Sequence, residues 1–190
     1  MNGTDIRTIK VLRELAGPSP GLLVARAAVA AFVSLEGDME EPMSAIQKTL
    51  KEGDREAADY LLGIICDLSF DGYVRAMVLE SVACSRSSWL EERVAKTIKE
   101  TMHDPDPDVA FSAIASASDL PLKLRKSLAK DIKVLLDDPN SPDDIRRESR
   151  AFLLLLDSAR IPAMPRPSQG KIRSFLGCLP WVGKMFKRGS

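Results

Sequence analysis

Apolar residues recur at spacings of three and four along most of this 190-residue chain, a period typical of amphipathic α-helices. The clearest stripe consists of Leu90, Val94, Ile98 and Met102, at strict four-residue spacing. Segments rich in Gly, Pro and Asp separate successive stripes and predict turns. We therefore expect nine helices and no strands, the helices beginning near residues 4, 21, 42, 54, 72, 88, 106, 121 and 141.

Short polar side chains and prolines mark several of the expected helix starts. Asp54 is expected to cap one helix, and Asp106 with Pro107 supplies a cap and a first-turn proline for another. Ser88 and Glu91 have the spacing of a capping box, in which each side chain accepts a backbone amide at the start of the helix.

The apolar stripes also predict which side chains are buried. We expect Leu68 and Leu153 in the core, each on the apolar side of its helix. Cys66 and Cys84 lie in apolar runs, where a free cysteine usually behaves as a small buried hydrophobe. The helix over about residues 21–36 is apolar nearly all round, so we expect neighbours on both sides of it.

The first expected helix is amphipathic and ends at the Gly17-Pro18-Ser19-Pro20 breaker. Its apolar side consists of Ile6, Ile9, Leu12 and Leu15. We interpret it as a terminal capping helix.

Similar stretches repeat at a nearly constant distance. Val74, Val109 and Ile145 occupy equivalent places in these stretches, 35 and 36 residues apart. Antiparallel helix pairs at this period cannot bury both apolar faces alone, so neighbouring pairs must stack into one continuous core.

The run Asp104-Pro105-Asp106-Pro107-Asp108-Val109, with the pairs Val74-Arg75 and Ile145-Arg146, resembles HEAT repeats over about residues 20–157. The resemblance implies an all-α fold, a short right-handed α-solenoid of antiparallel helix pairs. It also implies that the aspartate-proline segment forms the turn within a pair and that the valine-arginine pair opens the second helix. Ala110 stands where an arginine is typical, so a ladder of arginine and aspartate side chains should be interrupted there.

HEAT-like folds host several activities, and we take a non-enzymatic adaptor or protein-binding module as the default. Its partner would be another protein, bound on the concave face formed by the second helix of each pair. The candidate partner-binding residues on this face are Arg75, Glu80, Phe111, Arg146 and Arg147.

The charge is unevenly distributed along the chain. Residues 1–157 hold 20 Lys and Arg against 27 Asp and Glu, whereas residues 158–190 hold seven basic residues and no acid. An acidic body repels a polyanion, so nucleic acid is not the expected partner. We divide the chain into a helical repeat domain (1–158), a proline-rich linker (159–170) and a basic amphipathic tail (171–190).

In the tail, large apolar residues alternate with basic ones. Its candidate membrane- or partner-binding residues are Lys171, Arg173, Phe175, Leu176, Leu179, Trp181, Lys184, Phe186 and Lys187. Three interpretations remain open: a peripheral anchor on anionic lipid, a peptide that docks in a groove of another protein, and a segment that folds back on the domain.

Catalytic and metal-binding patterns are not found. The chain has one histidine, His103, expected in a surface or helix-capping role, and it has neither a Gly-x-Ser-x-Gly elbow nor a glycine-rich phosphate loop. Three widely spaced cysteines argue against a disulfide framework or a zinc site. We expect no cofactor, no enzymatic activity and a cytoplasmic location, with peripheral membrane attachment as the alternative.

Overall fold

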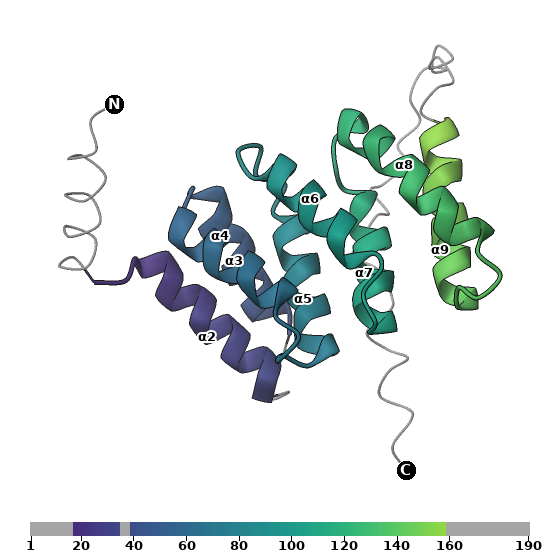
Figure 1. The fold of residues 1–190 in the computed structure, drawn as a ribbon. Helices are drawn as coiled ribbons and strands as arrows, with labels where there is room; N and C mark the ends of the chain where they lie inside the picture. The colour runs from purple at the N-terminus through teal and green to yellow at the C-terminus, as the bar shows by residue number, and fades with distance from the viewer. Residues whose placement is uncertain (1–16, 35–38, 159–190) are drawn as a thin grey trace, which may run out of the picture. The chain divides into compact units, whose positions relative to one another are not determined.

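The computed structural model describes residues 17–34 and 39–158, and over these ranges the chain is helical, without a strand (Figure 1). The predicted helix over residues 4–16 lies outside them. The eight helices are α2 (Pro20–Ser34), α3 (Glu40–Lys51), α4 (Arg55–Cys66), α5 (Gly72–Cys84), α6 (Glu91–Thr101), α7 (Pro107–Ala117), α8 (Leu122–Asp137) and α9 (Asp143–Ser158).

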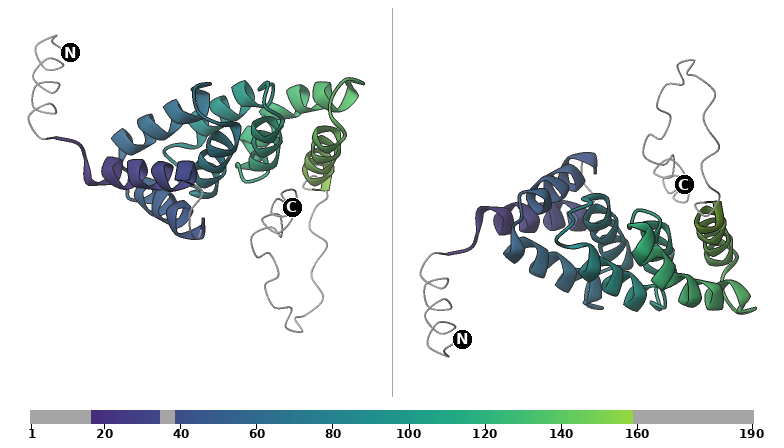
Figure 2. Two further views of the ribbon diagram at one scale, coloured as in Figure 1. Left: turned by 90° about the horizontal axis from the view of Figure 1, so that it is seen from below. Right: turned by 90° about the horizontal axis from the view of Figure 1, so that it is seen from above.

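The helices pack in sequential pairs: α2 with α3, α4 with α5, α6 with α7, and α8 with α9. The second helices of successive pairs also contact one another, in the order α3, α5, α7, α9. The first helices do the same, in the order α2, α4, α6, α8, and the views in Figure 2 show both series. The predicted pairing is therefore confirmed for the described helices.

The core runs through all four pairs, and its largest fully buried side chains come from successive helices. They include Phe32, Ile46, Leu50, Leu61, Ile65, Leu79, Leu90, Ile98, Met102, Ile114, Ile132 and Phe152. The predicted stripe from Leu90 to Met102 is buried throughout. Each such side chain contributes about 1.5–3 kcal/mol when it leaves water, so tertiary packing rather than helix propensity holds these short helices.

Two predicted helix starts are confirmed. The Asp54 carboxylate accepts a hydrogen bond from the amide of Ala57 at 2.9 Å. The Asp106 carboxylate accepts one from the amide of Asp108 at 2.9 Å. Pro107 is the first residue of α7, where its missing N–H costs nothing. These caps satisfy amides that have no partner within their own helix.

The predicted capping box at Ser88 and Glu91 is wrong. Helix α6 begins at Glu91, and no side chain caps it. The chain enters α6 through a backbone turn, in which the amide of Leu90 donates to the carbonyl of Ser87 at 2.8 Å. The neighbouring Trp89 is turned toward α3, where its indole N–H donates to the carbonyl of Leu50 at 3.1 Å.

Several predictions about burial are also wrong. Cys66 and Cys84 are exposed, because each is the last residue of its helix. Leu68 follows the end of α4 at Cys66 and is 68% exposed, so the helical period no longer places it in the core. Leu153 is half-buried.

Helix α2 is not enclosed on all sides by the described residues. Leu23, Val24 and Val33 are exposed, whereas the opposite side of α2 packs on α3, α4 and α5.

Candidate partner-binding surface

Arg75, the first candidate residue, is buried and holds a turn in place. It projects from α5 to the turn between α6 and α7, where Nη1 and Nη2 each donate to one carboxylate oxygen of Asp104 at 2.7 Å. The two side chains are only 4% and 7% exposed. A planar guanidinium can form this two-point contact and an ammonium cannot, so Arg75 has a structural role here.

The pKa of Asp104 is lowered, because its hydrogen-bond donors favour the charged carboxylate more than burial disfavours it. Burial alone would raise the pKa of Asp104, but hydrogen bonds from Arg75 and from the amide of Asp106 bring the pKa below its ordinary value. The ion pair therefore links the second pair of helices to the third.

No equivalent ion pair links the third pair to the fourth among the described residues. Asp138, at the end of α8, accepts the amide two residues later at 2.9 Å, just as Asp104 does. The residue in α7 that corresponds to Arg75 is Ala110, which is buried and has no group to offer Asp138. The interruption predicted at Ala110 is confirmed.

Glu80, the second candidate residue, lies half-buried on α5. The Ser112 hydroxyl on α7 donates to its Oε1 at 2.7 Å. Burial raises the pKa of Glu80, and burial together with the charge of Glu80 raises the pKa of Tyr73, one residue after the start of α5. The two side chains therefore lie on the same side of α5, at its junction with α7.

The remaining candidates lie on α7 and α9. Phe111 is half-buried and packs against the core. Arg146 is half-buried and donates to the carboxylate of Asp143, while Arg147 is exposed. Burial raises the pKa of Glu148, and the charge of Arg147 opposes that rise. Thus α9 offers a cation beside a half-buried carboxyl group.

We give the name second-helix surface to six of the accessible or half-buried side chains on α5, α7 and α9: Tyr73, Met77, Glu80, Phe111, Arg147 and Glu148. Aromatic, Met and Arg side chains are enriched at protein interfaces, whereas Glu is depleted. The sequence singled out Glu80, Phe111 and Arg147 but missed Tyr73, Met77 and Glu148. Adding the helical period to the 35-residue repeat could have found these three.

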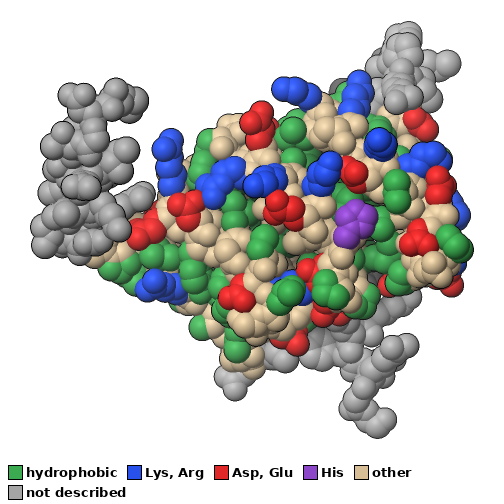
Figure 3. Space-filling view, in the orientation of Figure 1, with side chains coloured by type: hydrophobic (Ala, Val, Ile, Leu, Met, Phe, Trp, Pro, Cys, Tyr) green, Lys and Arg blue, Asp and Glu red, His purple; other side chains and the backbone are tan. Residues whose placement is uncertain are grey.

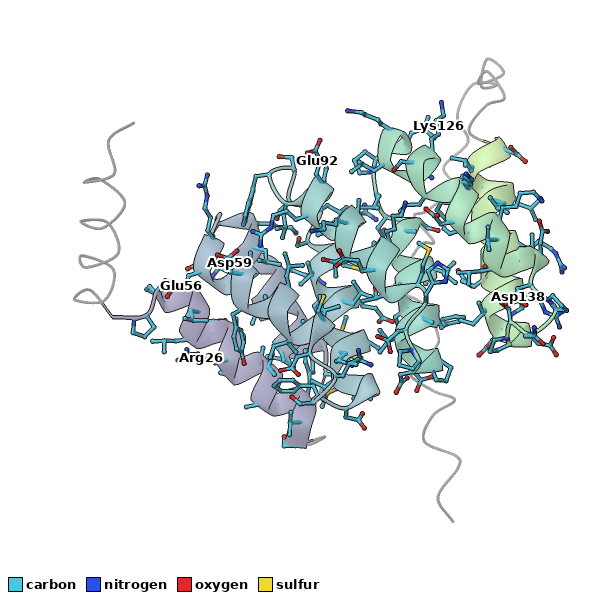
Figure 4. All side chains as sticks on the ribbon, in the orientation of Figure 1. Arg26, Glu56, Asp59, Glu92, Lys126 and Asp138 are labelled. Atoms are coloured by element: carbon cyan, nitrogen blue, oxygen red, sulfur yellow. The ribbon has the colours of Figure 1, made fainter. Side chains whose placement is uncertain are left out.

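The outward side of the first helices has a different character, with intermixed charges (Figures 3 and 4). Arg93 on α6 pairs with Asp59 on α4 at 2.7 Å, and Lys99 on α6 pairs with Asp131 on α8 at 3.0 Å. These pairs are open to water and contribute at most about 1 kcal/mol each. Lys126 on α8 points away from the helices (Figure 4) and is exposed.

His103 is exposed just after α6. No group of three or more His, Cys, Asp or Glu side chains there could hold a metal ion, and no described helix has the length and apolarity needed to cross a membrane. The candidate residues of the tail, 171–190, lie outside the described part of the chain.

Comparison of the chain with protein-family models, with curated proteins and with solved structures gives no match in any of the three.

Proposed function

We propose that the protein is a short right-handed α-solenoid of the HEAT type. Sequential helix pairs, contacts from each second helix to the next, and the Asp104–Asp106 turn between α6 and α7 support this proposal. The bidentate pair of Arg75 and Asp104 adds to it, because the arginine opens one second helix and the aspartate precedes the next.

On this fold, the proposed function is that of a non-enzymatic cytoplasmic adaptor that binds another protein along the second-helix surface. The observation that carries the proposal is the second-helix surface itself, where Tyr73, Met77 and Phe111 are half-buried and the Glu80 carboxyl group lies near Tyr73. A partner that covered these side chains would complete their burial, and it would find them on rigid, mutually packed helices.

Substitutions on the two sides of the domain test this function. Met77→Lys and Arg147→Glu change the second-helix surface, and Lys126→Glu on α8 is the matched control. Partners captured by the native protein, identified by mass spectrometry and then purified, should bind the control normally and bind the two variants at least about tenfold more weakly. Equal affinity for all four proteins would exclude this surface as the binding site.

The sequence of residues 171–190 supports a second candidate, a peripheral membrane protein attached through its tail. Five basic residues among large apolar ones, without an acid, suit an anionic lipid surface. Co-sedimentation with anionic and neutral liposomes tests it, using the native chain and a chain ending at Pro167. The candidate predicts that only the native chain binds and only to anionic liposomes; equal sedimentation of the two chains would remove it.

A further inference from the structure

Helix α2 presents an apolar face that the described residues leave open. Leu23, Val24 and Val33 are 53%, 39% and 57% exposed. Ala27 and Ala30, both exposed, continue this face along the helix. The charged residue nearby, Arg26, does not cover it, because its guanidinium lies over the ring of Tyr60, 5.8 Å from the centroid. We call these five apolar residues the α2 face.

The α2 face lies at the first end of the series of first helices. Each of α4 and α6 has another first helix on both sides of it, whereas α2 contacts only α4 in that series. The end of a stacked helical array needs a covering element with a polar outer side, because an exposed apolar end promotes association.

The connection that precedes α2 indicates what covers the face. Gly17 has a φ of +73°, the left-handed conformation that a glycine adopts directly after the last turn of a helix, and Pro18 follows it. Ser19 then caps α2, which begins at Pro20, and its hydroxyl accepts a hydrogen bond from the amide of Leu22 at 3.0 Å. Its own amide donates to the carboxylate of Glu56 at 2.9 Å, which fixes this end of α2 to α4. So short a connection between two helices brings them side by side and antiparallel.

We propose that residues 4–16 form a helix that packs antiparallel on the α2 face and caps the domain. Thirteen helical residues span about 20 Å, which matches the 15 residues of α2. The apolar stripe Ile6, Ile9, Leu12 and Leu15 would meet the α2 face. On such a helix Arg7, Lys10 and Glu14 lie on the half opposite the stripe and would supply the polar outer side, whereas Asp5 and Arg13 fall within the arc of the stripe.

Thiol labelling in the full-length chain tests the proposal. Cys66, Cys84 and Cys178 are first replaced by serine, and Leu23→Cys places one reporter thiol on the α2 face. Ile9→Gln with Leu12→Gln removes the apolar side of the segment, and Arg7→Gln with Lys10→Gln is the matched control on its charged side. The proposal predicts that the first pair of changes speeds labelling of the reporter about tenfold, while the control pair leaves it unchanged.

A second reporter, Lys126→Cys on α8, shows whether the domain still folds. Its labelling rate should be the same in all variants, with unchanged helical circular dichroism. Equal labelling of the Leu23→Cys reporter in both pairs would overturn the proposal. So would labelling that slows as protein concentration rises, with a dimer seen by light scattering, because a second copy would then be the occupant of the α2 face.

Discussion

Two junctions between successive second helices follow nearly the same spacing in the sequence, 35 and 36 residues, but are held differently. At the first junction, between α5 and α7, Arg75 reaches the turn before α7 and donates two hydrogen bonds to the carboxylate of Asp104. At the second junction, between α7 and α9, Ala110 stands in the place of the arginine, and Asp138 accepts only a local amide among the interactions described.

The fraction of buried residues also differs between the helices of the two junctions. Nine of the 13 residues of α5 and seven of the 11 residues of α7 are buried, against four of the 16 residues of α9. Among the described helices α9 has no second helix after it, so its low burial reflects its place at the end of the series as well as the missing ion pair. We expect the α8–α9 pair to open more readily than the helices before it.

The largest expected effect follows from breaking the first junction. Arg75→Met leaves the Asp104 carboxylate buried without its partner, and we expect a loss of about 3 kcal/mol in the free energy of unfolding. Chemical denaturation measures it. Adding Asp104→Leu should recover most of the loss, because the unpaired charge is then gone; a loss well under about 1 kcal/mol in the single variant would contradict a buried ion pair.

The destabilisation caused by Arg75→Met should decrease as the pH falls. In the native protein, the lowered pKa of Asp104 stabilises the fold above the unfolded pKa of about 3.9, and this contribution disappears as pH falls through the folded pKa. In Arg75→Met, burial without the guanidinium raises the pKa of Asp104, so the fold loses stability as pH rises through that value. The difference between the two proteins should therefore shrink as pH falls from 7 to about 3, measured by urea denaturation at each pH.

A smaller effect is expected from the close approach of α5 and α7 at Gly72. A Cβ atom there would overlap the carboxylate of Asp106, the side chain that caps α7. Gly72→Ala should lose this cap, at a cost of about 1–2 kcal/mol. Gly63→Ala on α4 is the matched control, because nothing lies within 4 Å of its Cβ position. It should stabilise the protein by about 0.5–1 kcal/mol, and thermal unfolding of both variants that gave equal shifts would contradict the close approach.

The smallest effect is expected from rebuilding the missing link at the second junction. Ala110→Arg should approach Asp138 as Arg75 approaches Asp104, although the extra volume at a buried position also has a cost. A double-mutant cycle with Asp138→Asn separates the energy of the new interaction with Asp138 from the cost of the extra volume. We expect a favourable coupling of about 1 kcal/mol, and no coupling would show that the junctions differ in geometry as well as in sequence.

The helical fold was largely predictable from the sequence because it depends on periodic burial. The stripe from Leu90 to Met102 follows from spacing, the caps at Asp54 and Asp106 from the residue types at helix starts, and the break at Ala110 from the resemblance to HEAT repeats. The wrong predictions fall where a backbone turn or the end of a helix replaces the structure that the local sequence pattern predicts. Ser88 has the spacing of a capping residue, but the backbone turn from Ser87 to Leu90 takes its place.

The candidate surface was harder to predict than the helices. Arg75, a predicted partner-binding residue, is instead buried against Asp104, 29 residues away, because the packing of α5 on the α6–α7 turn brings the two side chains together. Tyr73, Met77 and Glu148 have no local signal of their own, and only the helical period combined with the 35-residue repeat selects them.

Native-state hydrogen exchange compares the two junctions most directly. The central claim predicts that the amides of α8 and α9 exchange through a smaller opening free energy than those of α5 and α7, by about 1–3 kcal/mol. It further predicts that Arg75→Met lowers the protection of α5 and α7 toward that of α9. Equal protection of all four helices in the native protein, or a loss in Arg75→Met spread evenly over the whole domain, would contradict it.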